Sequence, residues 1–506
     1  ASYTNWKSQT AVKNRTPVLY VGANDGMMHG FRSSDGEEVM AYIPSNLFST
    51  DTTSGLHYLA DPAYLHRYYV DLPPTVTDAY VKATAAGTAA WRTLLLGGQR
   101  GGGKAIFALD ITDPTSFTEA NAANTVLWEF TESDLGYTYS EPTVALMNNG
   151  KWAAIFGNGY NDSGSGEAQL FIVYLEGGLD GIWTSGTDYI KISTGSGSTS
   201  DRNGLSTPAV IDEDGNGTAD RIYAGDLYGD LWAFDISNSS TSKWTVAHKS
   251  GNTLVPLYDG LSSQPITVEP VVATHPTEGG SPSYMVYFGT GQYLVDGDKT
   301  STDTQSFYGI WDSGDKLLQR SDLIQQTFET GFDTYYADYR VLTENQVNYA
   351  GGDDGWYIDL PTIAERVVVN PAIRGDIVHF NTLIPSLDPC TYGGDGWLMA
   401  VDMATGGRSN AEGAPIDTNG DGEVNEYDLL TNDDQSVVDA AASGKKFKGR
   451  KDGDGGGIPA ESAFLGDYQY TPGTNTDDGG DIQVDKIKDL GDSQTGRLSW
   501  EEISLD

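Results

Sequence analysis

The sequence predicts an all-β fold, a modified β-propeller with about seven irregular four-stranded blades and loop insertions. The chain holds 62 Gly, 29 Tyr and 11 Trp and lacks long runs with apolar residues spaced at three and four, which is typical of many short strands joined by glycine-rich turns. A strand-turn-strand unit recurs along it. At 506 residues the chain exceeds the usual size of one hydrophobic core, so a repeat array that shares its core between repeats is favoured.

The recurring unit is an apolar strand, a glycine-rich turn and a second strand that mostly ends in Asp. In the first copy, residues 18–31, the turn is Asn24-Asp25-Gly26, a strong hairpin signal because tight primed turns need positive φ. Further copies follow at residues 93–110, 221–235 and 394–402. In the last and weakest copy, we expect Gly394-Asp395-Gly396 to be the turn before a strand.

Strands with a proline near their start lie between the hairpins, at residues 140–145 and 206–211. One such strand, a hairpin and a connecting strand together make a four-stranded propeller blade. A β-sandwich, or several small β domains, would also show short strands, but neither needs the recurring unit. We therefore expect one domain over residues 1–506, with a Gly- and Asp-rich inserted loop at residues 410–457.

The charge is strongly negative, with 30 Lys and Arg against 71 Asp and Glu and a formal net charge of -41. Such a surface repels nucleic acid and anionic membranes and attracts divalent cations, although acidity can also serve only to keep a secreted protein soluble. No apolar run is long enough to span a membrane, so we expect neither nucleic-acid binding nor membrane insertion. The single cysteine, Cys390, cannot form an internal disulfide.

The most specific local pattern is the stretch 212–220, which predicts a calcium site. Oxygen-bearing side chains stand at loop positions one, three, five and nine, and a glycine stands at position six, where Ca²⁺ loops make a sharp bend. The expected ligands are Asp212, Asp214, Asn216, the carbonyl of Thr218, and Asp220. The twelfth position is Tyr223 and not Glu, so Asp220 has to close the loop. The alternative is a polar hairpin turn with incidental carboxylates.

A second stretch, residues 417–428, follows the twelve-residue calcium pattern and is similar to the dockerin loop, in which Asp closes the site. Its expected ligands are Asp417, Asn419, Asp421, the carbonyl of Glu423, Asn425 through a water molecule, and Asp428. A solvated acidic linker is the alternative, because the surrounding segment is rich in Gly and Asp.

Nothing in the sequence indicates catalysis. The six histidines are scattered without zinc-type spacing: His29, His57, His66, His248, His275 and His379. Gly101-Gly102-Gly103-Lys104 lacks the full phosphate-loop pattern and is expected to be a hairpin turn. Arg374-Gly375-Asp376 is an integrin-type tripeptide between strand-like runs, where a tight turn is the simpler interpretation.

Taken together, the repeats and loops resemble the C-terminal domain of the PilY/PilC-type adhesins associated with the tip of type IV pili. The resemblance rests on stretches spread in order over nearly the whole chain: 19–30 (LYVGANDGMMHG), 135–140 (LGYTYS), 153–161 (AAIFGNGYN), 204–235, 288–292 (FGTGQ), 355–360 (GWYIDL), 393–399 (GGDGWLM) and 496–500 (GRLSW).

This resemblance implies a secreted protein with a modified seven-bladed propeller, located at the cell surface or on pili. It also implies that the protein supports pilus assembly, adhesion and twitching motility and is not an enzyme. It implies Ca²⁺ in the loop at Asp212, Asp214, Asn216, Thr218 and Asp220, whose occupancy regulates pilus extension and retraction. The implied partners are major or minor pilins and a host or abiotic surface ligand.

Two other function classes stay open. A quinoprotein dehydrogenase also has propeller repeats with Asp-Gly turns, but such enzymes often use adjacent cysteines and hold calcium beside the quinone. A calcium-dependent, lectin-like adhesin without any link to pili is the second.

Overall fold

A computed structural model describes most of the chain. The described residues are 2–280, 282–314, 317–332, 335–388, 393–409, 415–448, 457–474 and 482–488. The chain divides into two compact units, one of residues 1–224 and 234–247 and one of residues 225–233 and 248–506.

Helix is a minor component of the described residues, as the composition predicts. The α-helices are three short ones: α1 (Tyr3–Lys7), α2 (Thr10–Lys13) and α3 (Ala122–Thr125). Single 3₁₀ turns add η1 (Ser45–Leu47), η2 (Gly55–Ala60), η3 (Pro114–Ser116), η4 (Glu119–Asn121), η5 (Thr241–Lys243), η6 (Asp296–Thr300), η7 (Arg320–Asp322), η8 (Tyr349–Gly351) and η9 (Glu426–Asp428). In the part of the chain that is described, no helix has the length and apolar character needed to cross a membrane.

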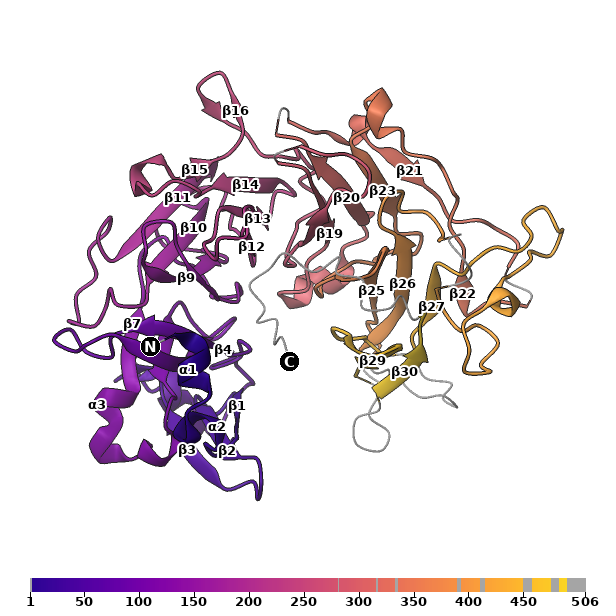
Figure 1. The fold of residues 1–506 in the computed structure, drawn as a ribbon. Helices are drawn as coiled ribbons and strands as arrows, with labels where there is room; N and C mark the ends of the chain where they lie inside the picture. The colour runs from indigo at the N-terminus through magenta and orange to yellow at the C-terminus, as the bar shows by residue number, and fades with distance from the viewer. Residues whose placement is uncertain are drawn as a thin grey trace. The chain divides into compact units, whose positions relative to one another are not determined.

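Four antiparallel sheets follow one another in chain order up to residue 246 (Figure 1); all belong to the first unit except residues 225–233 of the fourth. Their strands are β1 (Val18–Gly22), β2 (Met28–Arg32) and β3 (Glu38–Tyr42); β4 (Thr75–Val81), β5 (Ala90–Gly98), β6 (Ile106–Asp110) and β7 (Val126–Phe130); β8 (Thr143–Leu146), β9 (Trp152–Gly157), β10 (Glu167–Tyr174) and β11 (Tyr189–Gly197); and β12 (Ala209–Ile211), β13 (Arg221–Gly225), β14 (Leu231–Asp235) and β15 (Thr245–Val246).

The second unit begins with a small hairpin, β16 (Lys249–Ser250) and β17 (Thr253–Leu254). A five-stranded sheet follows, formed by β18 (Val271–Thr274), β19 (Tyr284–Gly289), β20 (Ser306–Asp312), β23 (Gly355–Asp359) and the parallel strand β21 (Ile324–Gln326). A second one contains β22 (Tyr339–Arg340), β27 (Gly444–Lys446), β26 (Gly394–Asp402), β25 (Ile377–Pro385) and β24 (Ala372–Arg374). The last sheet contains β28 (Ala463–Leu465), β29 (Tyr468–Pro472) and β30 (Ile482–Lys486).

The sheets vary in width. Of the seven sheets with three or more strands, three have four strands, two have three and two have five. Among the described residues, the sheets are as irregular as the sequence predicts, because later strands such as β21 and β22 return from distant loops to extend their sheets.

Aromatic side chains fill the space between neighbouring sheets. Phe156 on β9 and Phe171 on β10 stack at 5.7 Å, and Phe130 on β7 meets the Phe171 ring edge-on at 5.8 Å. All three are almost fully buried. Burial of each such ring stabilises the fold by roughly 1.5–3 kcal/mol, so this contact joins the sheet β4–β7 to the sheet β8–β11.

The expected hairpins are present in three of the four copies: β1 with β2, β5 with β6, and β13 with β14. The fourth expectation is wrong, because Gly394, Asp395 and Gly396 lie within β26 and pair with β25. A Cβ at Gly396 would lie 2.2 Å from the Thr382 carbonyl oxygen and 2.5 Å from Pro459. This glycine therefore permits a close approach of backbones and does not form a turn.

The segment 410–457, expected to be an inserted loop, contributes the strand β27 in its described part. Gly444, Lys445 and Lys446 pair with β26 and β22, so this part of the segment lies in a sheet. Cys390, the single cysteine, lies outside the described residues.

Candidate metal centre

The loop 212–220 joins β12 to β13 in the first unit. Ile211 pairs with Arg221 at the end of this antiparallel ladder, so the loop leaves and re-enters the sheet at facing residues. Asp212 therefore follows a buried strand directly, and Asp220 stands at the start of the next one. The ladder holds these two carboxylates opposite each other before any ion is considered.

Asp212 organises the loop backbone. Its Oδ1 accepts a hydrogen bond from the N–H of Gly215 at 2.8 Å, and its Oδ2 accepts one from the N–H of Gly217 at 2.7 Å. Both glycines have positive φ, +72° and +86°, which other L-residues rarely adopt. The glycines thus let the loop fold back over the Asp212 carboxylate.

The remaining oxygen-bearing side chains point along the same loop. Asp214 accepts a hydrogen bond from the Asn216 N–H at 3.1 Å, and Asn216 accepts one from the Thr218 N–H at 2.8 Å. Asp212, Asp214 and Asp220 each place one carboxylate oxygen within 4.8 Å of the others. Such a group of carboxylates could hold a metal ion, and an all-oxygen donor set suits a hard cation such as Ca²⁺.

Asn148 completes the surroundings of Asp220 and comes from the turn between β8 and β9 in the neighbouring sheet. Its amide nitrogen donates to Asp220 Oδ1 at 2.8 Å and to the Ala219 carbonyl at 2.8 Å, and its amide oxygen accepts from the Thr218 hydroxyl at 3.0 Å. The sequence analysis missed this residue. Asn148-Asn149-Gly150 has the composition of an ordinary turn, and only the tertiary fold brings it to the loop.

The second expected loop, residues 417–428, lies in the second unit and has the same internal pattern. Asp417 accepts from the N–H of Gly420 at 2.6 Å and of Gly422 at 3.0 Å, and these glycines have φ of +76° and +86°. Position by position, the backbone folds over Asp417 as it does over Asp212.

The closing residues also correspond. Asp428 accepts from the N–H of Thr418 at 2.7 Å, just as Asp220 accepts from the N–H of Glu213 at 3.0 Å. In both loops the last carboxylate is bonded to the second residue of the loop. Asp428 is fully buried, and the Tyr339 hydroxyl donates to the Thr418 carbonyl at 3.0 Å.

The two loops differ in how closely their acids gather. Among the described residues, Asp212, Asp214 and Asp220 are the one set of three acidic or metal-ligating side chains that converge within 4.8 Å. The carboxylates of Asp417, Asp421 and Asp428 do not form such a set. Asn419, Glu423 and Asn425 take part in backbone hydrogen bonds along the loop: the amides of Asn419 and Asn425 accept from Asp421 and Tyr427, and the Glu423 N–H donates to Asp421.

A family model described as the PilY1 beta-propeller domain matches residues 2–340. The chain belongs to this family. The PilY1 family model ends before the second loop, so the match covers the first loop only. Family membership shows the β-propeller fold that the repeats predict, and it confirms that the domain is not of an enzyme family.

Curated PilY1 relatives agree with the family model. The type IV pilus biogenesis factor PilY1 of Pseudomonas aeruginosa PAO1 is 36% identical over 445 residues, which are 79% of this chain and 36% of that protein. A PilY1 homologue of Xylella fastidiosa Temecula1 is 37% identical over 414 residues, 77% of this chain and 26% of that protein. The chain thus spans between about a quarter and about a third of the length of these relatives.

A solved PilY1 structure extends the likeness to the fold. The crystal structure of the P. aeruginosa PilY1 C-terminal domain is 31% identical to this chain, with a TM-score of 0.69 over 95% of this chain and 94% of that one. The coverage includes the second unit, which lies largely beyond the family model.

The two short motifs that suggested other chemistry lie in turns. Gly375 and Asp376 form the tight turn between β24 and β25, and the Arg374 guanidinium donates to the Gly466 carbonyl at 2.7 Å. Gly101, Gly102 and Gly103 lie in the β5–β6 hairpin, as expected, and do not precede a helix.

Proposed function

We propose that this propeller domain belongs to a type IV pilus-associated adhesin and biogenesis factor that senses calcium through the loop 212–220. The observation that carries the proposal is the convergence of Asp212, Asp214 and Asp220 within 4.8 Å in a member of the PilY1 family. Its partners are then major or minor pilins and a surface ligand, and its location is the cell surface or the pilus.

The proposed mechanism is electrostatic. Three carboxylates that share a small loop repel one another, and a divalent cation among them removes that repulsion and adds several oxygen contacts. Asn216 and the Thr218 carbonyl are the further ligands in this proposal. Because Asn148 already ties Asp220 and Ala219 to the neighbouring sheet, a bound ion would fix the loop against two sheets at once. Calcium occupancy would then set the geometry offered to a pilin and so the balance of pilus extension and retraction.

The loop 417–428 is proposed as a second calcium site. Support comes from its hydrogen bonds, which repeat those of the first loop from Asp417 to the closing Asp428. Its less gathered acids predict the weaker affinity of the two, because Ca²⁺ affinity rises with ligand charge and with rigidity of the site.

Calorimetric titration with Ca²⁺ tests both sites. We expect Asp214→Ala to remove the tighter site and Asp428→Ala the weaker one. Asp214 is suited to the test because it is exposed and accepts only one backbone hydrogen bond, so its removal should leave the fold intact. Asp296→Ala is the matched control, since this exposed acid lies outside both loops.

Unchanged Ca²⁺ stoichiometry in Asp214→Ala would refute the first site. The regulatory role needs a second measurement, twitching of the parent bacterium with Asp214→Ala in its full-length protein. Normal twitching of bacteria whose protein has lost the site would reject the regulatory role of calcium. The calcium binding of the unaltered domain would still stand.

A further inference from the structure

Arg100 is distinguished from every other described arginine by the lack of a side-chain hydrogen bond, although the nearby Asp71 carboxylate attracts its charge. The other arginines each donate at least one side-chain hydrogen bond. The Nε of Arg100 is buried without a partner, and in the described part of the chain its guanidinium has neither a hydrogen bond nor an ion pair. A guanidinium carries five donors, and an unsatisfied buried donor costs about 1–3 kcal/mol. In a chain with 71 acidic residues, a guanidinium that a carboxylate attracts but that donates no hydrogen bond needs an explanation.

The backbone holds Arg100 in place at some cost. Its φ is +51°, in the left-handed region that non-glycine residues rarely adopt. The Thr138 hydroxyl accepts hydrogen bonds from the N–H groups of Gln99, at 2.9 Å, and Arg100, at 3.1 Å. The Gly102 N–H donates to the Gln99 carbonyl at 2.7 Å. Strain that is held by such surrounding contacts is common at binding sites.

Tyrosines surround this arginine. The Arg100 guanidinium carbon lies 5.8 Å from the centre of the Tyr139 ring, and the Lys104 ammonium lies 5.2 Å from the centre of the Tyr137 ring. Tyr68 is 50% exposed and would contact a Cβ at Gly101. We call these five side chains, Arg100, Lys104, Tyr68, Tyr137 and Tyr139, the Arg100 surface.

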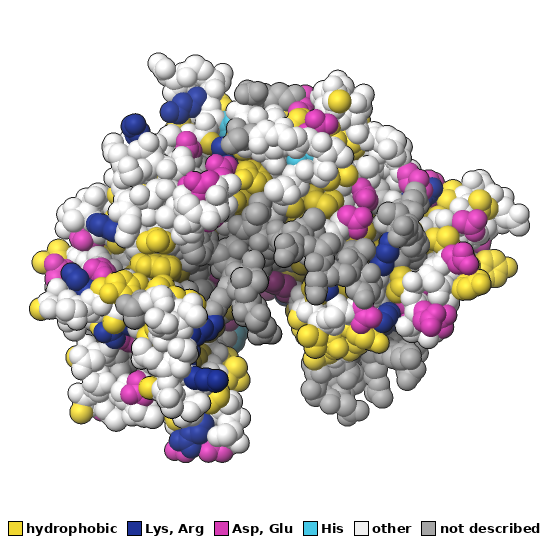
Figure 2. All heavy atoms as spheres, viewed as in Figure 1, with side chains coloured by type: hydrophobic (Ala, Val, Ile, Leu, Met, Phe, Trp, Pro, Cys, Tyr) yellow, Lys and Arg dark blue, Asp and Glu magenta, His cyan; other side chains and the backbone are white. Residues whose placement is uncertain are grey.

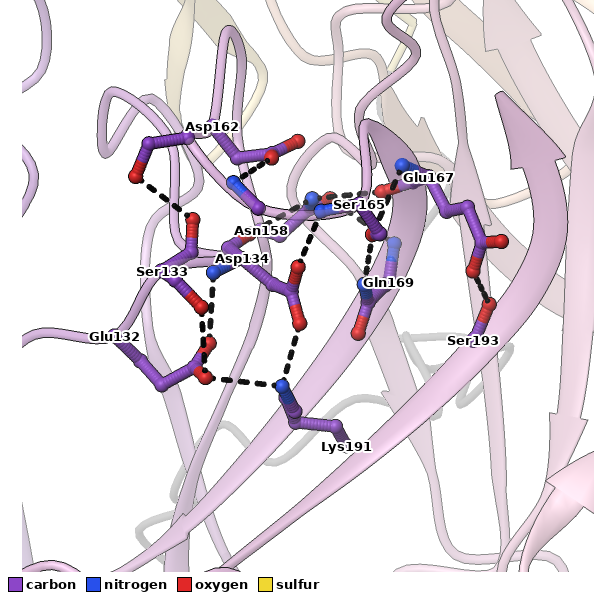
Figure 3. A network of polar contacts seen from close by, with 12 residues as sticks. Glu132, Ser133, Asp134, Asn158, Asp162, Ser165, Glu167, Gln169, Lys191 and Ser193 are labelled. Atoms are coloured by element: carbon purple, nitrogen blue, oxygen red, sulfur yellow. Dashed lines mark hydrogen bonds and ion pairs between the residues drawn. The ribbon is translucent and has the colours of Figure 1, made fainter. Parts of the chain in front are cut away.

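Figure 3 shows a polar network of residues around the turn between β9 and β10. Lys191 forms ion pairs with Glu132 at 3.1 Å and Asp134 at 2.5 Å, and Asp134 accepts from the Ser165 N–H at 2.7 Å. Asn158 donates to the carbonyls of Asp134 and Glu167. These bonds fix the turn between β9 and β10.

The turn between β9 and β10 contacts the Arg100 surface. The Tyr137 N–H donates to the Tyr160 carbonyl at 2.7 Å, and the Lys104 ammonium donates to the Asn161 carbonyl. The rings of Tyr139 and Tyr160 lie 5.4 Å apart. The surface is thus built on rigid supports, as precise recognition requires.

We propose that the Arg100 surface docks an extended acidic segment of a partner protein. An Asp or Glu carboxylate of the segment accepts hydrogen bonds from the Arg100 guanidinium, and its neighbouring side chains lie on the tyrosine rings. Arginine and tyrosine are the residues most enriched among energetically dominant interface positions. A carboxylate fits because it can accept two parallel bonds from the guanidinium fork.

The exposed ring of Tyr68 offers a flat face on which a peptide side chain can lie, and this favours a peptide over an acidic sugar. A small saccharide needs a concave pocket of several hundred Å³. Cavities of about 500 and 570 Å³ in the first unit are lined by other residues, around Arg92 and Asp110 and around Arg15 and Leu19. This docking surface shares no residue with the calcium loops, so its test is independent of them.

The test measures fluorescence anisotropy of a short labelled peptide of alternating Glu and Val, against the same peptide with Gln for Glu. The net charge of -41 repels the acidic peptide, so Glu-dependent binding reports a local site. We expect Arg100→Gln to weaken binding by at least about tenfold, and Tyr68→Ala to weaken it less. Arg67→Gln is the matched control, because Arg67 is an exposed arginine of the same unit that already donates to the Thr53 carbonyl; its variant should bind normally.

Each alternative outcome overturns the proposal. Equal affinity of the wild type and Arg100→Gln, or of the Glu and Gln peptides, removes the site. Binding of oligogalacturonate that depends on Arg100, without peptide binding, assigns the surface to an acidic saccharide. Thermal unfolding of Arg100→Gln shows whether this variant keeps its fold. If it does not, the peptide affinity of Tyr68→Ala, a substitution at an exposed residue, tests the surface instead.

Discussion

His29 shows at the residue scale how one side chain ties a turn to two strands. Its Nδ1 lies 2.5 Å from Glu38 Oε1 on β3, and its Nε2 lies 3.0 Å from Asp25 Oδ2 in the turn before β2. Carboxylates only accept hydrogen bonds, so both ring nitrogens must carry a proton. The geometry therefore describes an imidazolium between two carboxylates.

This arrangement gives the first sheet a pH dependence. Burial lowers the pKa of His29, but the hydrogen bonds and charges of Glu38 and Asp25 outweigh it, and the pKa lies above its ordinary value of 6.5. A raised pKa in the folded state stabilises the fold below pH about 6.5, and this stabilisation is lost as the pH rises through the raised value. We expect the unfolding temperature to fall between pH 6 and pH 8 by more in the wild type than in His29→Gln.

His57→Gln is the control for this experiment, because His57 is an exposed histidine of the same unit. Identical pH profiles of the wild type and His29→Gln, measured by differential scanning fluorimetry, would contradict the imidazolium assignment.

At the same scale, the sequence could predict only what lies within one loop. The spacing of Asp212, Asp214 and Asp220 is local, so their convergence follows from the loop pattern itself. Asn148 and Arg100 escaped prediction because their importance depends on contacts with residues far along the chain.

At the scale of elements, tight packing between strands decides which residues a position accepts. Gly97 on β5 faces Phe107 on β6, with which it is paired across the sheet. A Cβ at Gly97 would lie 2.3 Å from the Phe107 ring, closer than real contacts allow. Phe107 is fully buried and has no room to move away.

We therefore expect Gly97→Ala to lower the free energy of unfolding by about 1–3 kcal/mol through overpacking. Chemical denaturation of the purified domain measures this. Gly297→Ala is the control, because a Cβ there meets no atom within 4 Å. Equal stability of the two variants would show that the β5–β6 contact is looser than described.

Hairpins with a local turn signal were predictable, and strands defined by a remote partner were not. Asn24, Asp25 and Gly26 form the expected turn between β1 and β2. The segment Gly394-Asp395-Gly396 has a similar turn-like composition, but β25 is long enough to pair with it, so its residues lie in a strand. The 3₁₀ turn η9 ends at Asp428, whose carboxylate accepts a hydrogen bond from the Asn425 N–H.

The scale of the whole molecule is dominated by charge. A formal net charge of -41 implies repulsion throughout the folded state. Basic side chains lie among the acidic ones on the face seen in Figure 2 and moderate this repulsion locally. Monovalent salt screens what remains, since the Debye length falls from about 30 Å at 0.01 M to about 8 Å at 0.15 M.

We expect the unfolding temperature, measured in EDTA, to rise as NaCl increases over this range. At matched ionic strength, CaCl₂ without EDTA should raise it further, because site binding adds to screening. Asp214→Ala should lose much of the extra rise and keep the response to NaCl. A CaCl₂ effect no larger than that of NaCl would mean that calcium acts on this domain only as a counterion.

Asn148 links the loop 212–220 mechanically to the neighbouring sheet. Its amide crosses from the β8–β9 turn to the backbone and the final carboxylate of the loop, so two neighbouring blades share one small junction. Shear between those blades would load this amide junction together with the hydrogen bond from the Ala219 N–H to the Leu146 carbonyl, and a cation held by Asp220 would resist the same displacement. If the loop binds Ca²⁺ as proposed, the resistance of this junction to such displacement depends on the calcium concentration of the surrounding medium.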